Sequence, residues 1–420
     1  MDSNSIIRLN PPTDISRQKG QTELQQYESS LTPSRPLEAS RAAALSALFI
    51  AGFATFINLY ATQPLLPEFR RIFSASELMV SLTVSAPVLA VMLTAPLIGL
   101  LADATGRKRV IVAAILGLAV TTALTATAAN LYQLIIWRFL QGLFVPGIIA
   151  VAMAYISEES PSRSVGSTMA IYVTGTVVGG FSGRFIAGII AHHWGWRAPF
   201  VVLGALTLAG AFATWRILPR ARKFVPQNSA AALLGSLLSH LRNPQLLATF
   251  AVGSSVLCCM VAAFTYVNFY LADKPFYLGP AALAMIFAVY LIGAAVTPVA
   301  GRILDRVGYR RGLMGAAGIL ATGMLLTLIH YVPVIIGGLA VAATGVFICQ
   351  AAASSNVGKA AEIAGSSATG LYVAFYYLGG FAGSILPGFF WKQTGWSGCV
   401  AIIICIQMLA ALIAYRFWKN

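Results

Sequence analysis

Long apolar segments, separated by short polar ones, make up most of the chain after residue 41. Each is about 20 residues long, the length that an α-helix needs to cross the hydrocarbon core of a bilayer. Residues 1–41 are polar and contain several prolines, so we expect a disordered tail there. The pattern predicts twelve membrane-spanning helices at residues 42–65, 77–101, 109–129, 131–156, 165–191, 197–217, 246–271, 281–300, 311–330, 332–356, 367–391 and 397–417.

The longest polar interruption after the tail lies at residues 218–245, between the sixth and seventh apolar segments. It predicts a linker between two bundles of six helices, at residues 42–217 and 246–417, with residues 418–420 as a short tail. The expected fold class is therefore an all-α polytopic membrane protein.

Composition supports a membrane protein. The chain has 420 residues, of which 58% are hydrophobic and only 10% are charged. A soluble domain usually has about 25% charged residues, because it must cover its surface with them. This composition argues against a soluble enzyme, a nucleic-acid-binding protein and a disordered protein.

The net charge of +15 is interpreted here as a topology signal. With the N-terminus on the inside, the inner tails and loops contain 21 of the 28 Lys and Arg residues and the outer loops contain five. Cytoplasmic loops of membrane proteins are enriched in Lys and Arg. We therefore expect both termini in the cytoplasm.

The two halves of the chain resemble each other. Internal similarity at a long, near-constant offset indicates a structural repeat. Two parallel repeats would form pseudo-symmetric bundles with a central cavity between them, and rocking of the bundles would alternate access to that cavity. Three segments match in the same order: Gly99–Arg109 with Gly301–Arg311, Gly179–Gly183 with Gly379–Gly383, and Thr55–Tyr60 with Thr265–Tyr270.

These motifs resemble those of the major facilitator superfamily, over residues 42–418. Gly99–Arg109 is similar to the cytoplasmic loop signature of that family, and Arg138–Gly142 to its fourth-span signature. Gly175–Gly183 resembles the fifth-span signature of the antiporter branch, except that Gly180 replaces a proline. Tyr60–Pro67 and Tyr155–Glu159 resemble the YnfM-like group of bacterial inner-membrane transporters, within the drug-efflux-type branch with twelve spans.

The resemblance implies roles for two sets of residues. In the family, the loop signature latches the two halves together in the outward-facing state; simple topogenic charge is the alternative. The expected latch residues are Gly99, Asp103, Gly106, Arg107, Asp305 and Gly308. The small residues of spans five and eleven would act as a hinge or as ordinary close-packing positions. They are Gly175, Gly179, Gly180, Gly183, Gly379, Gly380 and Gly383.

Two arginines, Arg138 and Arg184, lie inside predicted spans, whereas no acidic residue lies in the middle of one. A charge inside the bilayer costs about 2.5 kcal/mol or more and usually faces a cavity or a partner. A guanidinium binds carboxylate or phosphate through two parallel hydrogen bonds. We therefore expect an anionic or zwitterionic substrate; the alternative is that either arginine is structural, bonded to backbone carbonyls or extended toward the interface.

The remaining cavity candidates are polar residues of spans that line the cavity in this family. A buried amide needs hydrogen-bond partners, which makes the repeated asparagines the better candidates, whereas a tyrosine can equally anchor the protein at the lipid interface. The predicted substrate-binding residues besides the two arginines are Asn58, Gln141, Asn268, Gln350, Tyr60 and Tyr270.

The expected function is secondary active transport, with proton-coupled efflux of a small anionic or zwitterionic compound or drug. Alternatives are uptake of a carboxylate by proton symport and a non-transporting membrane sensor. The sequence contains no nucleotide-binding, zinc-protease or nucleophile-elbow motif, so we expect no enzyme activity, no cofactor and no metal site. The expected partners are a small molecule, protons and the lipid bilayer, but no nucleic acid. We expect a monomer in the bacterial inner membrane.

Overall fold

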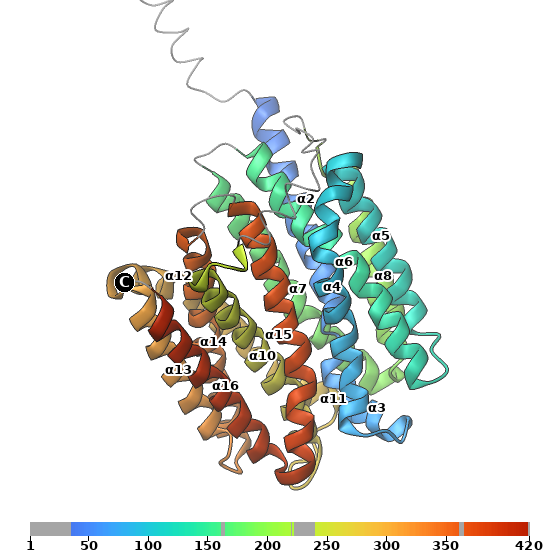
Figure 1. Ribbon diagram of the computed structural model, residues 1–420. Coiled ribbons are helices and arrows are strands. Elements are labelled where there is room, and N and C mark those ends of the chain that lie inside the picture. The colour runs from blue at the N-terminus through green and yellow to red at the C-terminus, as the bar shows by residue number, and fades with distance from the viewer. Residues whose placement is uncertain (1–34, 161–163, 220, 222–239, 361–364, 419–420) are drawn as a thin grey trace, which may run out of the picture.

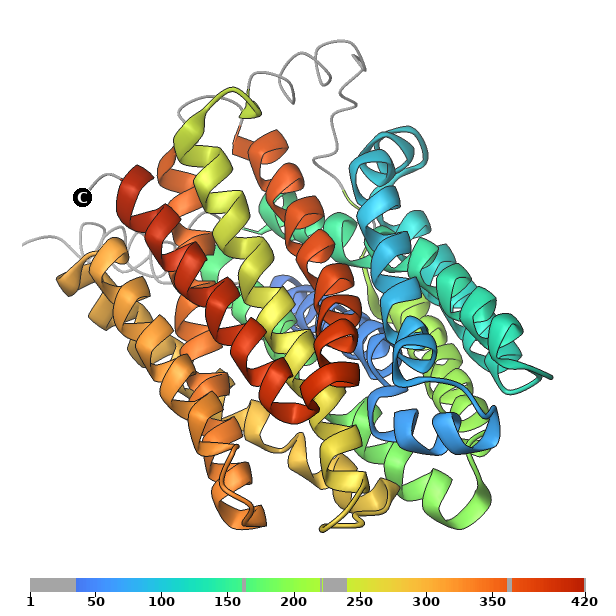
Figure 2. The ribbon, with the colours of Figure 1, turned by 60° about the horizontal axis from the view of Figure 1, so that its bottom comes forward.

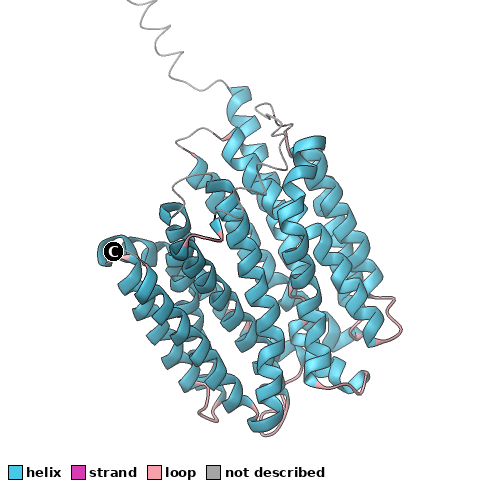
Figure 3. Cartoon of the chain, viewed as in Figure 1, coloured by secondary structure: helices cyan, strands magenta, loops and turns pink. Residues whose placement is uncertain are grey.

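The computed structural model describes residues 35–160, 164–219, 221, 240–360 and 365–418. Every regular element in this part of the chain is helical, as Figure 3 shows. The first helix, α2, begins at Arg35 and so includes the last residues of the segment that we expected to be a disordered tail.

Most of the helices follow one another with short connections (Figure 1), whereas the helices that end at Ile217 and begin at Pro244 are separated by residues 218–243, most of which lie outside the described residues. Their bounds are α2 (Arg35–Leu59), the 3-10 helix η1 (Gln63–Leu65), α3 (Leu66–Ile72), α4 (Glu77–Thr105), α5 (Arg107–Thr125), α6 (Leu131–Glu159), α7 (Val165–Trp194), α8 (Ala198–Ile217), α10 (Pro244–Ala272), α11 (Pro280–Ile286), α12 (Val289–Val307), α13 (Tyr309–Leu326), α14 (Val332–Ala360), α15 (Gly365–Thr394) and α16 (Trp396–Phe417).

Ten segments of the described chain are long and apolar enough to cross a membrane. The two expected spans outside this set are the eighth and the ninth. The ninth corresponds to α13, whose first turn carries Arg310 and Arg311. The eighth is divided into α11 and α12, and only residues 280–292 form a shorter apolar stretch.

The break between α11 and α12 lies at Phe287 and Ala288. Here the amide nitrogens of Phe287, Ala288 and Tyr290 donate to carbonyl oxygens three residues earlier, at distances of 3.0–3.3 Å. This tighter hydrogen bonding is that of a 3-10 turn and interrupts the α-helix. The interruption brings Phe287 and Tyr290 to the same arginine, described below.

Helices α2 to α8 pack mainly on one another, and so do α10 to α16. In the first group α2 lies against α7 and α8, and α6 lies between α4 and α5. In the second, α10 contacts α14, α15 and α16. The groups meet where α4 packs on α15 and α7 packs on α11 and α12, as can be followed in Figures 1 and 2.

The connections repeat between the two groups. Gly106 and Gly308 precede α5 and α13 with φ angles of 93° and 89°, and Gly195 and Gly395 precede α8 and α16 with φ angles of 75° and 65°. These left-handed conformations favour glycine, because a side chain would be strained there. Matched glycines therefore produce the same turns in the two halves of the sequence.

Glycines also allow two pairs of helices to approach closely. A methyl group at Gly175, Gly179 or Gly183 of α7 would overlap backbone carbonyl groups of α2. A methyl group at Gly379 or Gly383 of α15 would overlap those of α10 in the same way. Absence of side chains at this spacing lets two backbones approach closely, which drives helix association in membranes.

Candidate functional site

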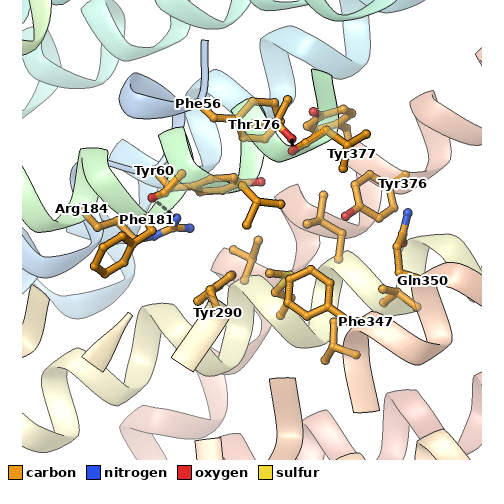
Figure 4. Close-up of a pocket in the computed structure, with 18 residues that line it drawn as sticks. Phe56, Tyr60, Thr176, Phe181, Arg184, Tyr290, Phe347, Gln350, Tyr376 and Tyr377 are labelled. Atoms are coloured by element: carbon orange, nitrogen blue, oxygen red, sulfur yellow. Dashed lines mark hydrogen bonds between the residues drawn. The ribbon is translucent and has the colours of Figure 1, made fainter. Parts of the chain in front are cut away.

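A cavity of about 260 Å³ lies between the two groups of helices. Its walls come from α2 and α7 on one side and from α10, α12, α14 and α15 on the other (Figure 4). Most of the lining side chains are apolar or aromatic. Of the residues predicted from the sequence, it brings together Tyr60, Gly180, Arg184 and Gln350.

Among the described residues that line this cavity, Arg184 has the one charged side chain. It lies on α7 and is 3% exposed. Its Nε donates to Oε1 of Gln63 at 2.7 Å, and its Nη1 donates to the carbonyl oxygen of Gly180 at 2.6 Å. Nη2 donates to none of the described residues, and neither partner carries a charge.

Gly180 lies beside this arginine on the same helix. The guanidinium bonds the carbonyl of Gly180, four residues earlier. A methyl group built on Gly180 would lie 3.4 Å from Nη1 of Arg184, which is an ordinary van der Waals distance. The glycine that replaces the proline of the family signature therefore borders the cavity without being required by the space that the guanidinium occupies.

Three aromatic rings surround the guanidinium of Arg184. Its central carbon lies 4.8 Å from the ring centroid of Tyr60, 4.9 Å from that of Phe287 and 4.8 Å from that of Tyr290. A cation within about 6 Å of an aromatic face is attracted by it. The rings hold the charge in the bilayer without neutralising it.

Gln63 connects this site to the second group of helices. Its Nε2 donates to the hydroxyl of Thr265 on α10 at 3.2 Å, while its Oε1 accepts from Arg184. The side chains of Gln63 and Thr265 are fully buried. A buried amide with both ends bonded has a fixed orientation, so the position of Arg184 depends on contact between the two groups.

The end of the molecule that carries α3 and α11, at the bottom of Figure 1, is called the α3 end here. The two groups of helices are also joined by hydrogen bonds at this end. Arg70 on α3 donates to both carboxylate oxygens of Asp273, at 2.5 and 2.9 Å, and to Glu77 at 2.9 Å. Further inside, the hydroxyls of Ser85 and Ser384 lie 2.6 Å apart.

Arg138, which we expected to bind substrate, is fully buried and is not among the residues that line the cavity. It donates to the carbonyl oxygens of Thr83, Asn58 and Leu59 at 3.0, 2.9 and 2.5 Å, and also to the side chain of Gln141. Asn58 and Leu59 form the last turn of α2, whose carbonyls lack partners within the helix. Arg138 therefore caps α2.

Asn58 and Gln141 belong to the same buried network rather than to the cavity. The hydroxyl of Thr122 donates to Asn58 at 3.0 Å and accepts from Gln141 at 2.8 Å. Asn58 also donates to Thr207 at 2.8 Å. The network joins α2, α5, α6 and α8, so these amides satisfy one another inside the first group of helices.

The remaining predicted residues lie in different places. Asn268 is buried and donates to the carbonyl of Phe264, four residues earlier, at 2.6 Å. Tyr270 stacks on Trp396, with ring centroids 5.5 Å apart. Neither is among the residues that line the cavity. Gln350 does line it, and accepts from the hydroxyl of Tyr372 at 3.5 Å.

The predicted latch residues lie at the end opposite to α3. Arg107 makes a two-pronged ion pair with Glu158, at 2.7 and 3.2 Å, which joins α5 to α6. Asp103 and Asp305 are each two residues before the end of their helix, α4 and α12. Their side chains, and the surroundings of Gly99, lie outside the described part of the structure.

Sequence reasoning missed several residues of the site. Gln63 was visible only as part of a family-like segment, although a glutamine just before Pro64 in an apolar region is a polar signal. Phe287 and Tyr290 gave no signal, because the break that orients them contains neither proline nor glycine.

The chain is similar to known transport proteins. Residues 48–367 match the model of the Major Facilitator Superfamily. The chain is 38% identical to the inner membrane transport protein YnfM of Escherichia coli (strain K12), over 89% of this chain and 90% of that protein. It is 32% identical to the multi-drug resistance efflux pump PmrA of Streptococcus pneumoniae, over 40% of this chain and 43% of the pump.

Solved structures show the same fold. A bacterial homologue of the human lysosomal transporter Spinster, in an inward-facing and occupied conformation, superposes with a TM-score of 0.74. The superposition covers 92% of this chain and 98% of the homologue, at 16% sequence identity.

Proposed function

The chain belongs to the major facilitator superfamily, and from that premise we propose that it exports a small anionic or zwitterionic organic compound in exchange for protons. Secondary transport by a membrane protein is what the family itself supports. The similarity to YnfM supports a place in the bacterial inner membrane.

The substrate proposal rests on the position of Arg184. It lies in a cavity between the two groups of helices, without an acidic partner in the cavity wall. A guanidinium in such an apolar site is stabilised when an anion from outside the chain binds it. The ligand then neutralises a charge that the fold leaves uncompensated.

We further propose twelve spans in two pseudo-symmetric bundles, at residues 42–217 and 246–417, with 218–245 as a cytoplasmic linker. The matched turns at Gly106 and Gly308 and at Gly195 and Gly395 support the symmetry. The eighth span would then consist of α11 and α12 together. With both termini in the cytoplasm, the α3 end faces outward.

In this arrangement the α3 end is the outer gate, closed by Arg70, Asp273 and Gln63. Opening it would break these bonds as the bundles rock. The residues of the loop signature would latch the opposite, cytoplasmic end when the outer gate opens. Alternating access needs one gate closed at a time, and the bonds at the α3 end favour a state closed to the outside.

The proposed direction is efflux. The partial match to an efflux pump and the glycines of α7 support it. Uptake of a carboxylate by proton symport is the second candidate, because Arg184 would serve either direction equally. A non-transporting sensor is not favoured, since the cavity retains its buried charge.

The proposal is tested in inside-out vesicles that contain the full chain and an imposed pH gradient. Addition of organic anions should collapse the gradient, and organic cations should not. In Arg184→Gln the response to organic anions should be at least about tenfold weaker, because loss of one charge-assisted hydrogen bond weakens binding by about that factor. The control is Arg197→Gln, whose guanidinium lies outside the cavity lining. Collapse by cations, or an unchanged response in Arg184→Gln, would refute the anion site.

A further inference from the structure

We propose that the cavity selects an organic monoanion: a carboxylate on a small aromatic body, with an uncharged polar group at its far end. This inference rests on the proposed function and narrows its substrate class, because it excludes zwitterions, dianions and inorganic anions. Three features of the cavity support it: its single charge, its aromatic walls and the position of its one lining amide.

The positive charge of Arg184 favours a ligand with one negative charge and no other charge. Arg184 is the sole charged side chain in the described part of the cavity wall, and its two hydrogen-bond partners are a neutral amide and a backbone carbonyl. A bound carboxylate would restore neutrality. The ammonium of a zwitterion or the second charge of a dianion would have no counter-charge in this wall, and an unpaired buried charge is strongly disfavoured.

The three rings around Arg184 restrict how the anion approaches. Tyr60, Phe287 and Tyr290 each lie within 5 Å of the guanidinium carbon, and Gln63 and Gly180 occupy two of its nitrogens. Nη2 donates to no described side chain or carbonyl. Little room is left for a bulky head, so the flat carboxylate fits better than a tetrahedral phosphate or sulfate ester.

The rest of the wall requires an apolar body. Phe181, Phe347, Met260 and Val177 are among the lining residues. An inorganic anion would leave these side chains without a contact, whereas burial of an aromatic ring gains about 25 cal/mol for each Å² removed from water. A cavity of about 260 Å³ lies below the 300–1,000 Å³ that is typical for drug-sized ligands. The body is therefore about one ring in size.

The far end offers neutral polar groups, the amide of Gln350 and the hydroxyl of Tyr376. Figure 4 shows Gln350 across the cavity from Arg184, with Tyr290 and Phe347 between them. The Oε1 of Gln350 accepts from Tyr372 at 3.5 Å, which leaves its amide nitrogen to donate. An uncharged acceptor at the far end of the ligand, such as a phenol or a carbonyl oxygen, would satisfy it.

The inference is tested by isothermal titration calorimetry on the full chain in lipid nanodiscs. The probe is 3-(4-hydroxyphenyl)propionate. The comparison compounds change its charge or remove its apolar body: its primary amide is neutral, tyrosine adds an ammonium, 3-(4-carboxyphenyl)propionate has a second carboxylate in place of the hydroxyl, and propionate lacks the hydroxyphenyl ring. The probe should bind at least about tenfold more tightly than each comparison compound, since each lacks or mismatches one charge-assisted or apolar contact.

Two variants locate the selectivity. Arg184→Gln should abolish the preference for the acid over its amide, whereas Arg197→Gln should retain it. If Arg184→Gln does not fold, Gln350→Leu remains informative, because it leaves the charged end intact. It should weaken binding of the hydroxylated probe severalfold and leave 3-phenylpropionate unchanged.

Equal binding of the amide, equal binding of tyrosine, or no binding of the probe at millimolar concentration would overturn the inference. The vesicle experiment separates this result from the broader proposal. If the probe binds but is not transported, the monoanion site stands and efflux fails. If other anions are transported and the probe does not bind, efflux stands and the monoanion class fails.

Discussion

At the scale of single residues, two buried arginines show how similar sequence signals lead to different roles. Arg138 and Arg184 both lie within apolar spans and both are almost fully buried. Arg138 directs its donors to three carbonyls and a glutamine, so the fold itself satisfies it. Arg184 has two neutral partners and one amino group that bonds no described residue. Only the second leaves capacity for a ligand.

The first prediction concerns Arg138. Arg138→Lys should destabilise the protein by about 2 kcal/mol or more, because a lysine cannot reach the same acceptors on α2, α4 and α6 together. Thermal unfolding in detergent should show a lower midpoint, while the folded fraction binds 3-(4-hydroxyphenyl)propionate with unchanged affinity. An unchanged midpoint combined with weaker binding would instead place Arg138 in the substrate site.

The second prediction concerns the proton. Glu68 is half-buried on α3, and its Oε2 has no hydrogen-bond partner in the described structure. By contrast, Glu77, Asp273 and Glu158 accept hydrogen bonds from arginines. Glu68 has Arg71 as a neighbouring charge but forms no ion pair with it in the described structure. Its carboxyl can therefore gain or lose a proton without breaking an ion pair. Glu68→Gln should therefore abolish transport driven by a pH gradient but retain exchange of labelled for unlabelled substrate.

The control for this experiment is Glu159→Gln. Glu159 is the last residue of α6 and lies at the end of the molecule opposite to the α3 end. It should retain both proton-driven transport and exchange. Full proton-driven transport in Glu68→Gln would show that the proton is carried elsewhere, for example by the substrate carboxylate itself.

The candidate site was only partly predictable from the sequence. Arg184, Tyr60 and Gln350 were identified, because a charge, a matched motif or a polar residue within a span is visible in one dimension. The separation of Arg138 from Arg184 was not, because backbone carbonyls satisfy Arg138 and every sequence contains them. Asn58 and Gln141 were assigned to the cavity because their spans line it in the family. Their threonine partners lie on other helices, and these contacts could not be read from the sequence.

At the scale of helices, glycines allow α7 to approach α2 and α15 to approach α10 closely. The sequence could predict the close pairs but could not distinguish packing positions from cavity positions within one motif. Gly179 and Gly183 lie against the backbone of α2, whereas the neighbouring Gly180 lines the cavity beside Arg184. The three residues are close in sequence, but they lie on different faces of a helix with 3.6 residues per turn.

The third prediction follows from this difference. Gly183→Ala and Gly379→Ala should each destabilise the protein by about 1–3 kcal/mol, because the added methyl group would overlap a carbonyl group of the neighbouring helix. Gly180→Ala should fold, since its methyl group would lie 3.4 Å from the movable end of a side chain. Thermal unfolding in detergent compares the three variants, and equal midpoints for all of them would contradict the assignment.

The division of the eighth span shows a limit of hydropathy. Residues 281–300 give one apolar segment, and the sequence therefore predicts one helix. The structure has α11 and α12 with a 3-10 turn between them, and that turn brings Phe287 and Tyr290 to Arg184. Hydropathy records burial but not the local hydrogen-bond pattern, so a break without proline or glycine cannot be read from it.

At the scale of the whole molecule, the bonds at the α3 end join the two groups of helices around the site. Gln63 bonds both Arg184 and Thr265, and Arg70 bonds Asp273. An anion on Nη2 of Arg184 would bind the same guanidinium whose Nε holds Gln63. We therefore expect binding in the cavity to be coupled to closure at the α3 end, which is how a substrate would affect the balance between the two states of an alternating-access transporter.

The last prediction tests whether this end must open during transport. Arg70→Cys and Asp273→Cys are combined in a variant whose five native cysteines are replaced. A short thiol-specific crosslinker should join the two helices, since the native side chains are in direct contact. Crosslinking should abolish transport in vesicles, and a crosslinker that contains a reducible bond should restore it on reduction. Each single-cysteine variant should be insensitive to the reagent.

Full transport by the crosslinked protein would mean that the α3 end stays closed throughout the cycle. The cavity would then exchange its contents by another route, and the outer-gate proposal would have to be abandoned while the anion site at Arg184 remained.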